Sequence, residues 1–211
     1  MLRKICAFLA VICLAVLSAH GADIFKDVKV EMKFTSTPTY TVSGTPNSTR
    51  GNSKWLVLDI SYKVPNIKEA WGDNIDVEVA ALLPVSRKGE RGIVYLTGKT
   101  TLAAVRLDGK IHRTRMLIPP HVFERYSASE TTALSDISVQ VKIYSPDDEL
   151  LGETIESKNN MRNAEQAFQE AETKGQKGLI MMKNYILSRE RTPWFYVMHD
   201  YFDPIAPEAS K

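Results

Sequence analysis

The chain has 211 residues, a formal net charge of +2, 25% charged residues and 44% hydrophobic residues. This is the composition of an ordinary globular protein, and it excludes a disordered, collagen-like or coiled-coil chain. The length allows one domain with an appendage.

Residues 1–21 have the pattern of a signal peptide. Two basic residues precede the 13 apolar residues Ile5–Leu17, and Ala19 and Gly21 place small side chains where a signal peptidase cleaves. The apolar run is shorter than the roughly 20 residues of a membrane-spanning helix. We therefore expect cleavage after Gly21, no membrane span in the mature protein, and a location in the periplasm, on the outer surface or in the medium. A retained membrane anchor is the alternative.

Removal of this segment leaves a mature chain without cysteine and without net charge. Cys6 and Cys13 are its two cysteines, so disulfides, thiol catalysis and thiolate metal sites are excluded from the mature protein. Arg3 and Lys4 leave as well, so that 25 of the 27 basic residues remain against 25 acidic ones. A neutral chain has no global attraction for nucleic acid or anionic lipid, and we expect neither as a partner.

Residues 22–157 contain short stretches in which apolar and polar side chains alternate, the pattern of half-buried strands. The most regular alternation includes Val139 and Val141, which we expect to face the core from a central strand. The predicted strands are residues 28–34, 55–63, 75–81, 93–96, 100–107, 111–118, 137–143 and 150–155.

No segment long enough for a crossover helix separates these strands, which argues against a parallel α/β sheet. Their regular spacing predicts a mostly β protein, an immunoglobulin-like antiparallel β-sandwich, with a small closed barrel as the alternative. Trp55 is a candidate to pack between the two sheets. Asp108 and Gly109 predict a tight turn, and residues 119–126 predict a short helical turn.

Beyond Ser157 the apolar spacing becomes helical. A stripe from Met161 to Ala171 predicts an amphipathic helix, and a second stripe predicts another helix over residues 176–189. The predicted organisation is a signal peptide at 1–21, an immunoglobulin-like β-sandwich at 22–157, and C-terminal helices with an aromatic tail packing on the sandwich at 158–211.

Candidates for catalysis or metal binding are few. His112, His121 and His199 have no His or Cys partner at metal-ligand spacing. The acidic turns lack the spacing of a calcium loop, and the chain has no nucleophile elbow and no glycine-rich phosphate loop. We therefore expect no enzymatic activity, no cofactor and no metal. A hydrolase whose site is assembled from separate loops stays an alternative, because paired carboxylates can meet only in three dimensions.

The region from Trp194 onward is the densest aromatic run of the chain, and such side chains are enriched at protein interfaces. We expect this run to dock on the sandwich and cover an open edge, with part of its surface available to a partner or a second copy. Trp71, followed by Gly72, is expected in an exposed loop. The candidate interaction residues are Trp71, Trp194, Phe195, Tyr196, Tyr201 and Phe202. A carbohydrate-binding or adhesive module is an alternative, in which an exposed tryptophan stacks on a sugar ring.

The pattern of the whole chain resembles a known bacterial family. It combines a cleaved signal, a cysteine-free sandwich, a helical appendage and the closing run from Pro193 to Ile205. It is similar to the small secreted immunoglobulin-like proteins of the type IV pilus-like gene cluster of Akkermansia and related bacteria. The resemblance implies an exported structural or interaction protein whose partners are proteins, including pilus-like components or a second copy of the chain. The sequence lacks a pilin leader and hydrophobic spine, which favours an accessory role over that of a polymerising subunit.

Overall fold

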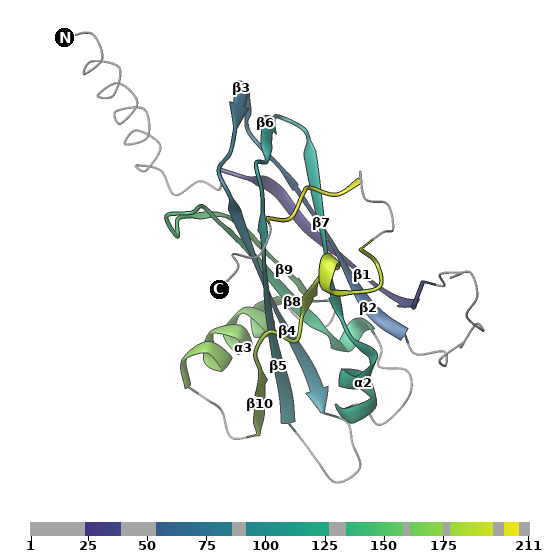
Figure 1. Ribbon diagram of the computed structural model, residues 1–211. Helices are drawn as coiled ribbons and strands as arrows, with labels where there is room; N and C mark the ends of the chain where they lie inside the picture. The colour runs from purple at the N-terminus through teal and green to yellow at the C-terminus, as the bar shows by residue number, and fades with distance from the viewer. Residues whose placement is uncertain are drawn as a thin grey trace, which may run out of the picture.

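The alternating stretches of the sequence form the strands of two packed sheets and a short projecting arm, as the computed structural model shows (Figure 1). The structure describes residues 24–38, 54–85, 92–126, 134–157, 161–174, 178–195 and 201–206, so the predicted signal peptide lies outside it. The strands are β1 (Lys26–Ser36), β2 (Lys54–Lys63), β3 (Asn66–Trp71), β4 (Ile75–Val85), β5 (Gly92–Leu102), β6 (Arg106–Asp108), β7 (Ile111–Ile118), β8 (Ser138–Tyr144), β9 (Leu150–Ser157), β10 (Leu179–Met182) and β11 (Leu187–Ser188). The helices are α2 (Pro120–Tyr126) and α3 (Met161–Lys174), with 3-10 turns at Leu134–Asp136 and Arg189–Arg191.

The core lies between a four-stranded sheet of order β1-β2-β7-β11 and a five-stranded sheet of order β10-β5-β4-β8-β9. Alternate side chains of these strands point into it, among them Leu58 and Ile60 of β2 and Val79 of β4. Val139 and Val141 of β8 are fully buried, and β8 is paired on both sides, by β4 and β9. The predicted immunoglobulin-like β-sandwich is therefore confirmed, and the two described sheets stay separate instead of closing into a barrel.

Two strand predictions differ from the structure. Residues 93–96 and 100–107 were expected to form two strands, but β5 runs unbroken through Thr97, Gly98 and Lys99, and β6 is a separate short strand. Strand β3 was not anticipated; it pairs with β6 to form a two-stranded sheet. The predicted turn is confirmed at Gly109, which has φ +75°; it leads from β6 into β7, which pairs with β2 in the four-stranded sheet. The predicted helical turn is α2.

Trp55 does not lie between the sheets as predicted. Odd-numbered side chains of β2 face outward because Leu56 and Leu58 face the core. Trp55 and Val57 therefore lie on the outer face of the four-stranded sheet, where they form a second apolar cluster with Leu117 of β7 and with Trp194.

Helix α3 confirms the first predicted C-terminal helix. Its buried side chains Ala164, Phe168 and Ala171 recur at the spacing of one helical face. Phe168 and Ala171 pack on the outer face of the five-stranded sheet, against residues that include Leu82 and Tyr95. The ring centroids of Phe168 and Tyr95 are 6.4 Å apart.

The second predicted helix, over residues 176–189, is wrong. The described part of this stretch contains β10, a turn at Asn184, which has φ 61°, and the short strand β11. Strand β10 pairs in parallel with β5, a departure from the antiparallel pairing expected throughout. The physical reason is that the edges of β5 and β7 have free backbone groups, and pairing with them outweighs a short stretch's weak helical preference.

Residues 178–195 and 201–206, here named the C-terminal strap, close one side of the sandwich. Strand β10 pairs with β5, β11 pairs with β7, and the Ile186 amide donates to the Thr97 carbonyl at 3.1 Å. The strap then crosses the outer face of the four-stranded sheet and returns to β5, where the Ala206 amide donates to the Thr101 carbonyl at 2.8 Å. It thus joins the two sheets at both ends of its described course (Figure 1).

Candidate interaction site

Of the six residues expected to serve interaction, the five that the structure describes fall into two groups. Trp194 and Phe202 are buried, with exposures of 3% and 7%, and Phe195 is half-buried. Trp71 and Tyr201 are exposed, at 64% and 49%. Tyr196 lies outside the described residues. The structure therefore brings part of the aromatic run onto the sandwich. Trp71 is exposed as predicted, but it is the last residue of strand β3, paired with Arg106, and does not lie in a loop.

Trp194 is an intramolecular contact of the strap. Its indole packs edge-on against that of Trp55, with ring centroids 5.3 Å apart and an interplanar angle of 70°. Val57 and Leu117 complete the cluster beneath it. Edge-to-face aromatic pairs add to the stabilisation gained from burying apolar area, so Trp194 fixes the strap to the four-stranded sheet.

Phe202 makes the second contact of the strap with this sheet. The guanidinium carbons of Arg115 and Arg189 lie 4.7 Å and 5.1 Å from its ring centroid, within the range of a cation–π contact. Arg115 is held in place by a hydrogen bond to Asp59, which Lys33 also contacts at 2.7 Å. Burial would raise the pKa of Asp59, but the hydrogen bonds from Arg115 and Lys33 outweigh it and lower the pKa. Asp59 is therefore a charged structural partner.

Asp203 ties the strap to a polar network at the end of the core. Its carboxylate accepts a hydrogen bond from the Tyr62 hydroxyl at 2.7 Å and lies 2.7 Å from Nδ1 of His112. The other ring nitrogen, Nε2, lies 3.2 Å from the carboxylate of Asp108 on β6. The contact with Asp203 raises the pKa of His112, with Asp108 adding to the effect against a smaller opposing effect of burial. His112 thus links the strap to β6, and protonation of its ring strengthens both contacts.

We predict that this network stabilises the fold more at low pH. Because the pKa of His112 is higher in the folded chain than in the unfolded one, its contribution is complete below the unfolded pKa and is lost as the pH rises through the folded pKa. The melting temperature of the wild type should therefore exceed that of His112→Gln by a margin that is largest below the ordinary histidine pKa of about 6.5 and shrinks as the pH rises above it. His121→Gln is the control, and a margin that stays constant or grows with pH would contradict the prediction.

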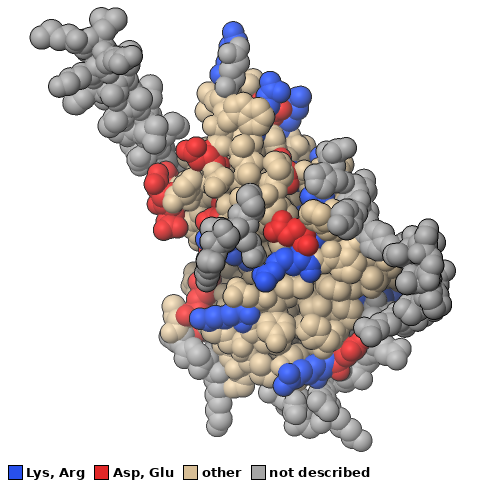
Figure 2. Space-filling model, viewed as in Figure 1, with Lys and Arg blue, Asp and Glu red and all other residues tan. Residues whose placement is uncertain are grey.

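Among the described residues, the largest group of exposed apolar side chains on adjoining elements is on the β3–β6 arm, residues 66–71 and 106–111. Ile67, Trp71 and Ile111 are 48%, 64% and 54% exposed. Arg106 lies opposite Trp71 in the strand pair, with its guanidinium 5.9 Å from the indole. Figure 2 shows basic side chains at the tip of the arm and uncharged surface below them. Large aromatic and aliphatic groups beside an arginine are the composition of an interface centre.

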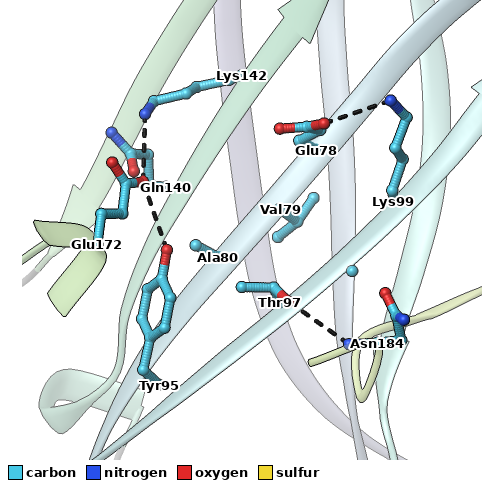
Figure 3. Close-up of a pocket in the computed structure, with 11 residues that line it drawn as sticks. Glu78, Val79, Ala80, Tyr95, Thr97, Lys99, Gln140, Lys142, Glu172 and Asn184 are labelled. Carbon is cyan, nitrogen blue, oxygen red and sulfur yellow. Dashed lines mark hydrogen bonds and ion pairs between the residues drawn. The ribbon is translucent and has the colours of Figure 1, made fainter. Parts of the chain in front are cut away.

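A polar hollow of about 300 Å³ opens on the outer face of the five-stranded sheet, next to α3. Its lining residues come from β4, β5, β8, α3 and the turn before β11: Glu78, Val79, Ala80, Tyr95, Thr97, Gly98, Lys99, Gln140, Lys142, Glu172 and Asn184 (Figure 3). None of these residues was predicted from the sequence to form a site. A trace of this site is present in the sequence: the side chains of these strands that face away from the core include charged residues of both signs.

The described residues contain no group of three His, Cys, Asp or Glu side chains arranged to hold a metal ion. His112 contacts two carboxylates, but each of its ring nitrogens faces a different one, so that the ring lies between Asp108 and Asp203 and the three groups do not converge on one point. His199 lies outside the described residues. None of the described helices is both long enough and apolar enough to cross a membrane.

Comparisons with known proteins agree with this architecture. A family model matches residues 18–209, nearly the whole chain. A search of curated proteins gave no match. A crystal structure of a protein from Akkermansia muciniphila superposes with a TM-score of 0.67 and 14% sequence identity, over 88% of this chain and 93% of that one. At this identity the superposition shows a shared fold.

Proposed function

The chain belongs to the family of small immunoglobulin-like proteins of Akkermansia and related bacteria named above, and we propose that it is an exported interaction protein associated with a pilus-like surface apparatus. We propose further that it works by protein–protein contact and not by catalysis. The rigid sandwich would display the β3–β6 arm, and the strap would hold the sandwich closed. The amino-terminal pattern of residues 1–21 supports export.

One observation carries this proposal: some of the aromatic side chains pack within the chain itself, whereas others are exposed to solvent. Trp194 and Phe202 are buried against the chain's own sheet, whereas Trp71 is 64% exposed on a projecting element. Trp71 has few rotamers to lose and a large apolar area to bury, which makes it suited to the centre of a protein contact. The arm is therefore the surface that we assign to the partner.

The carbohydrate-binding alternative has narrower support. Of the three tryptophans proposed to stack on sugars, Trp55 and Trp194 pack against each other and Trp194 is buried. Trp71 alone among them has an exposed ring, and Arg106 lies against it.

The hydrolase alternative would need a carboxyl group able to donate a proton, whereas the pKa values of Asp59 and Asp108 are lowered, which keeps these groups ionised.

Replacement of Trp71 by alanine tests the assignment of the arm. We expect Trp71→Ala to leave the melting temperature within about 1–2 °C of the wild type, because the side chain is exposed, and to reduce copurification with components of the pilus-like apparatus about tenfold or more. Tyr185→Ala removes another exposed aromatic, 38% accessible, and is the matched control. Equal copurification by wild type and Trp71→Ala would contradict the proposal.

Export has a separate test. Amino-terminal sequencing of protein recovered outside the cytoplasm should begin at Ala22, and deletion of residues 1–21 should retain the protein in the cytoplasm. Exported protein that still begins at Met1 would show that the segment is kept.

A further inference from the structure

We propose that the polar hollow on the five-stranded sheet binds a neutral polyhydroxylated ligand, a monosaccharide unit. The hollow is lined by no residue of β3 or β6, which form a separate two-stranded sheet, so this inference is independent of the function assigned to the arm. Its volume of about 300 Å³ is at the lower end of the range for small-molecule sites, which suits one sugar ring.

Two facing groups of side chains build the hollow (Figure 3). On one side, Lys142 contacts Glu172 of α3 at 3.4 Å, and the Tyr95 hydroxyl donates to the same carboxylate at 3.4 Å. On the other side, Lys99 contacts Glu78 at 3.3 Å. Val79 and Ala80 lie between the two groups, where the methyl group of Ala80 leaves room above the sheet.

Gln140 is the clearest sign that this hollow receives a polar ligand. The residue is 7% exposed and lines the hollow from β8. Its side-chain amide has no hydrogen-bond partner among the described residues, although it has one acceptor and two donor positions. The amide atoms are not fully buried, since the fully buried unpaired side-chain atoms of the described residues belong to Thr100 and Arg189, so the amide is open to a molecule seated in the hollow.

The charges of the hollow decide the class of that molecule. Lys99 and Lys142 are balanced within the lining by Glu78 and Glu172, and Asp76 also contacts Lys99 at 2.8 Å. A free anion would meet these carboxylates, and a cation would meet both ammonium groups, so neither gains net attraction. Hydroxyl groups donate to carboxylates and accept from ammonium and amide groups, and a ring with several hydroxyls matches this alternation.

Nuclear magnetic resonance titration of the isotopically labelled protein tests the inference. The probes are the methyl glycosides of glucose, galactose and N-acetylglucosamine, with the free sugars beside them, and glucuronate and glucosamine as charged controls. At least one neutral probe should shift the backbone amides of Val79, Gly98 and Gln140, with weak, millimolar affinity because the residues that line the hollow include no exposed aromatic ring. Binding of the methyl glycoside would indicate a unit within a glycan, and binding of the free sugar alone would indicate a small metabolite.

Two variants connect the response to the hollow. Gln140→Met keeps the size of the side chain and removes its amide, and should weaken binding of the neutral probe about three- to tenfold while the protein stays folded. Lys33→Met removes a lysine on the other sheet and should leave binding unchanged. The inference is overturned if no neutral probe shifts these amides, if charged and neutral probes act alike, or if folded Gln140→Met binds as the wild type does.

Discussion

Truncation after Thr192 is expected to destabilise the domain severely. It removes Trp194 and Phe202, which are buried against the four-stranded sheet, and Asp203, which pairs with His112. Loss of a buried tryptophan side chain alone costs about 3–5 kcal/mol, a large share of the roughly 5–15 kcal/mol of a typical domain. Calorimetry should show a melting temperature lowered by many degrees, and a dye that binds apolar surface should fluoresce more strongly.

Point variants separate the contribution of Trp194 from effects of the truncation itself. Trp194→Ala should reproduce most of the loss, because Trp55, Val57 and Leu117 then lose the ring that covers them. Tyr201→Ala, at a site 49% exposed in the same strap, should change the free energy of unfolding by no more than about 1 kcal/mol. If the truncated chain melted like the wild type, the strap would be shown to rest on the sheet without stabilising it.

Val141→Asp is expected to have an effect of similar size through a different cause. Val141 is fully buried on β8, paired with Val79 of β4 on one side and Thr154 of β9 on the other. Aspartate there must either remain charged in an apolar core or take up a proton, and each outcome costs several kcal/mol. Chemical denaturation should show a much lower midpoint, or a chain that does not fold.

Ile67→Asp is the matched control for this substitution. It makes a comparable apolar-to-acid replacement at a side chain that is 48% exposed on the arm, and should leave the denaturation midpoint nearly unchanged. Wild-type stability of Val141→Asp would mean that β8 does not face the core as described.

The sandwich was predictable from the sequence because its signal is local. Val139 and Val141 alternate with polar neighbours, and a strand with one buried face must show that period. The same reasoning predicted α3 from the spacing of Ala164, Phe168 and Ala171. Trp55 shows the limit of this reasoning. Alternation separates the two faces of a strand, but a large aromatic residue on the outer face looks like a core residue until the segment that packs over it, here the strap with Trp194, is known.

The strap and the hollow were not predictable because their causes are not local. Leu179, Met182 and Ile186 have helical spacing, yet β10 and β11 form because β5 and β7 offer free edges far away in the sequence. Gln140 and Glu172 belong to separate elements and meet only when α3 packs on the sheet. The exposure of Trp71 agrees with expectation, whereas its role in binding a partner stays a prediction.

The central claim is that the arm binds the partner while the strap packs on the chain's own sheet. A photo-crosslinking amino acid placed at position 71 or at position 201 in intact cells tests this claim directly. Both native side chains are exposed aromatics, so the two positions are matched in accessibility. We expect position 71 to give crosslinks to components of the pilus-like apparatus and position 201 to give none. Crosslinks to those components from position 201 with none from position 71 would contradict the account, because the partner would then bind the strap and not the arm.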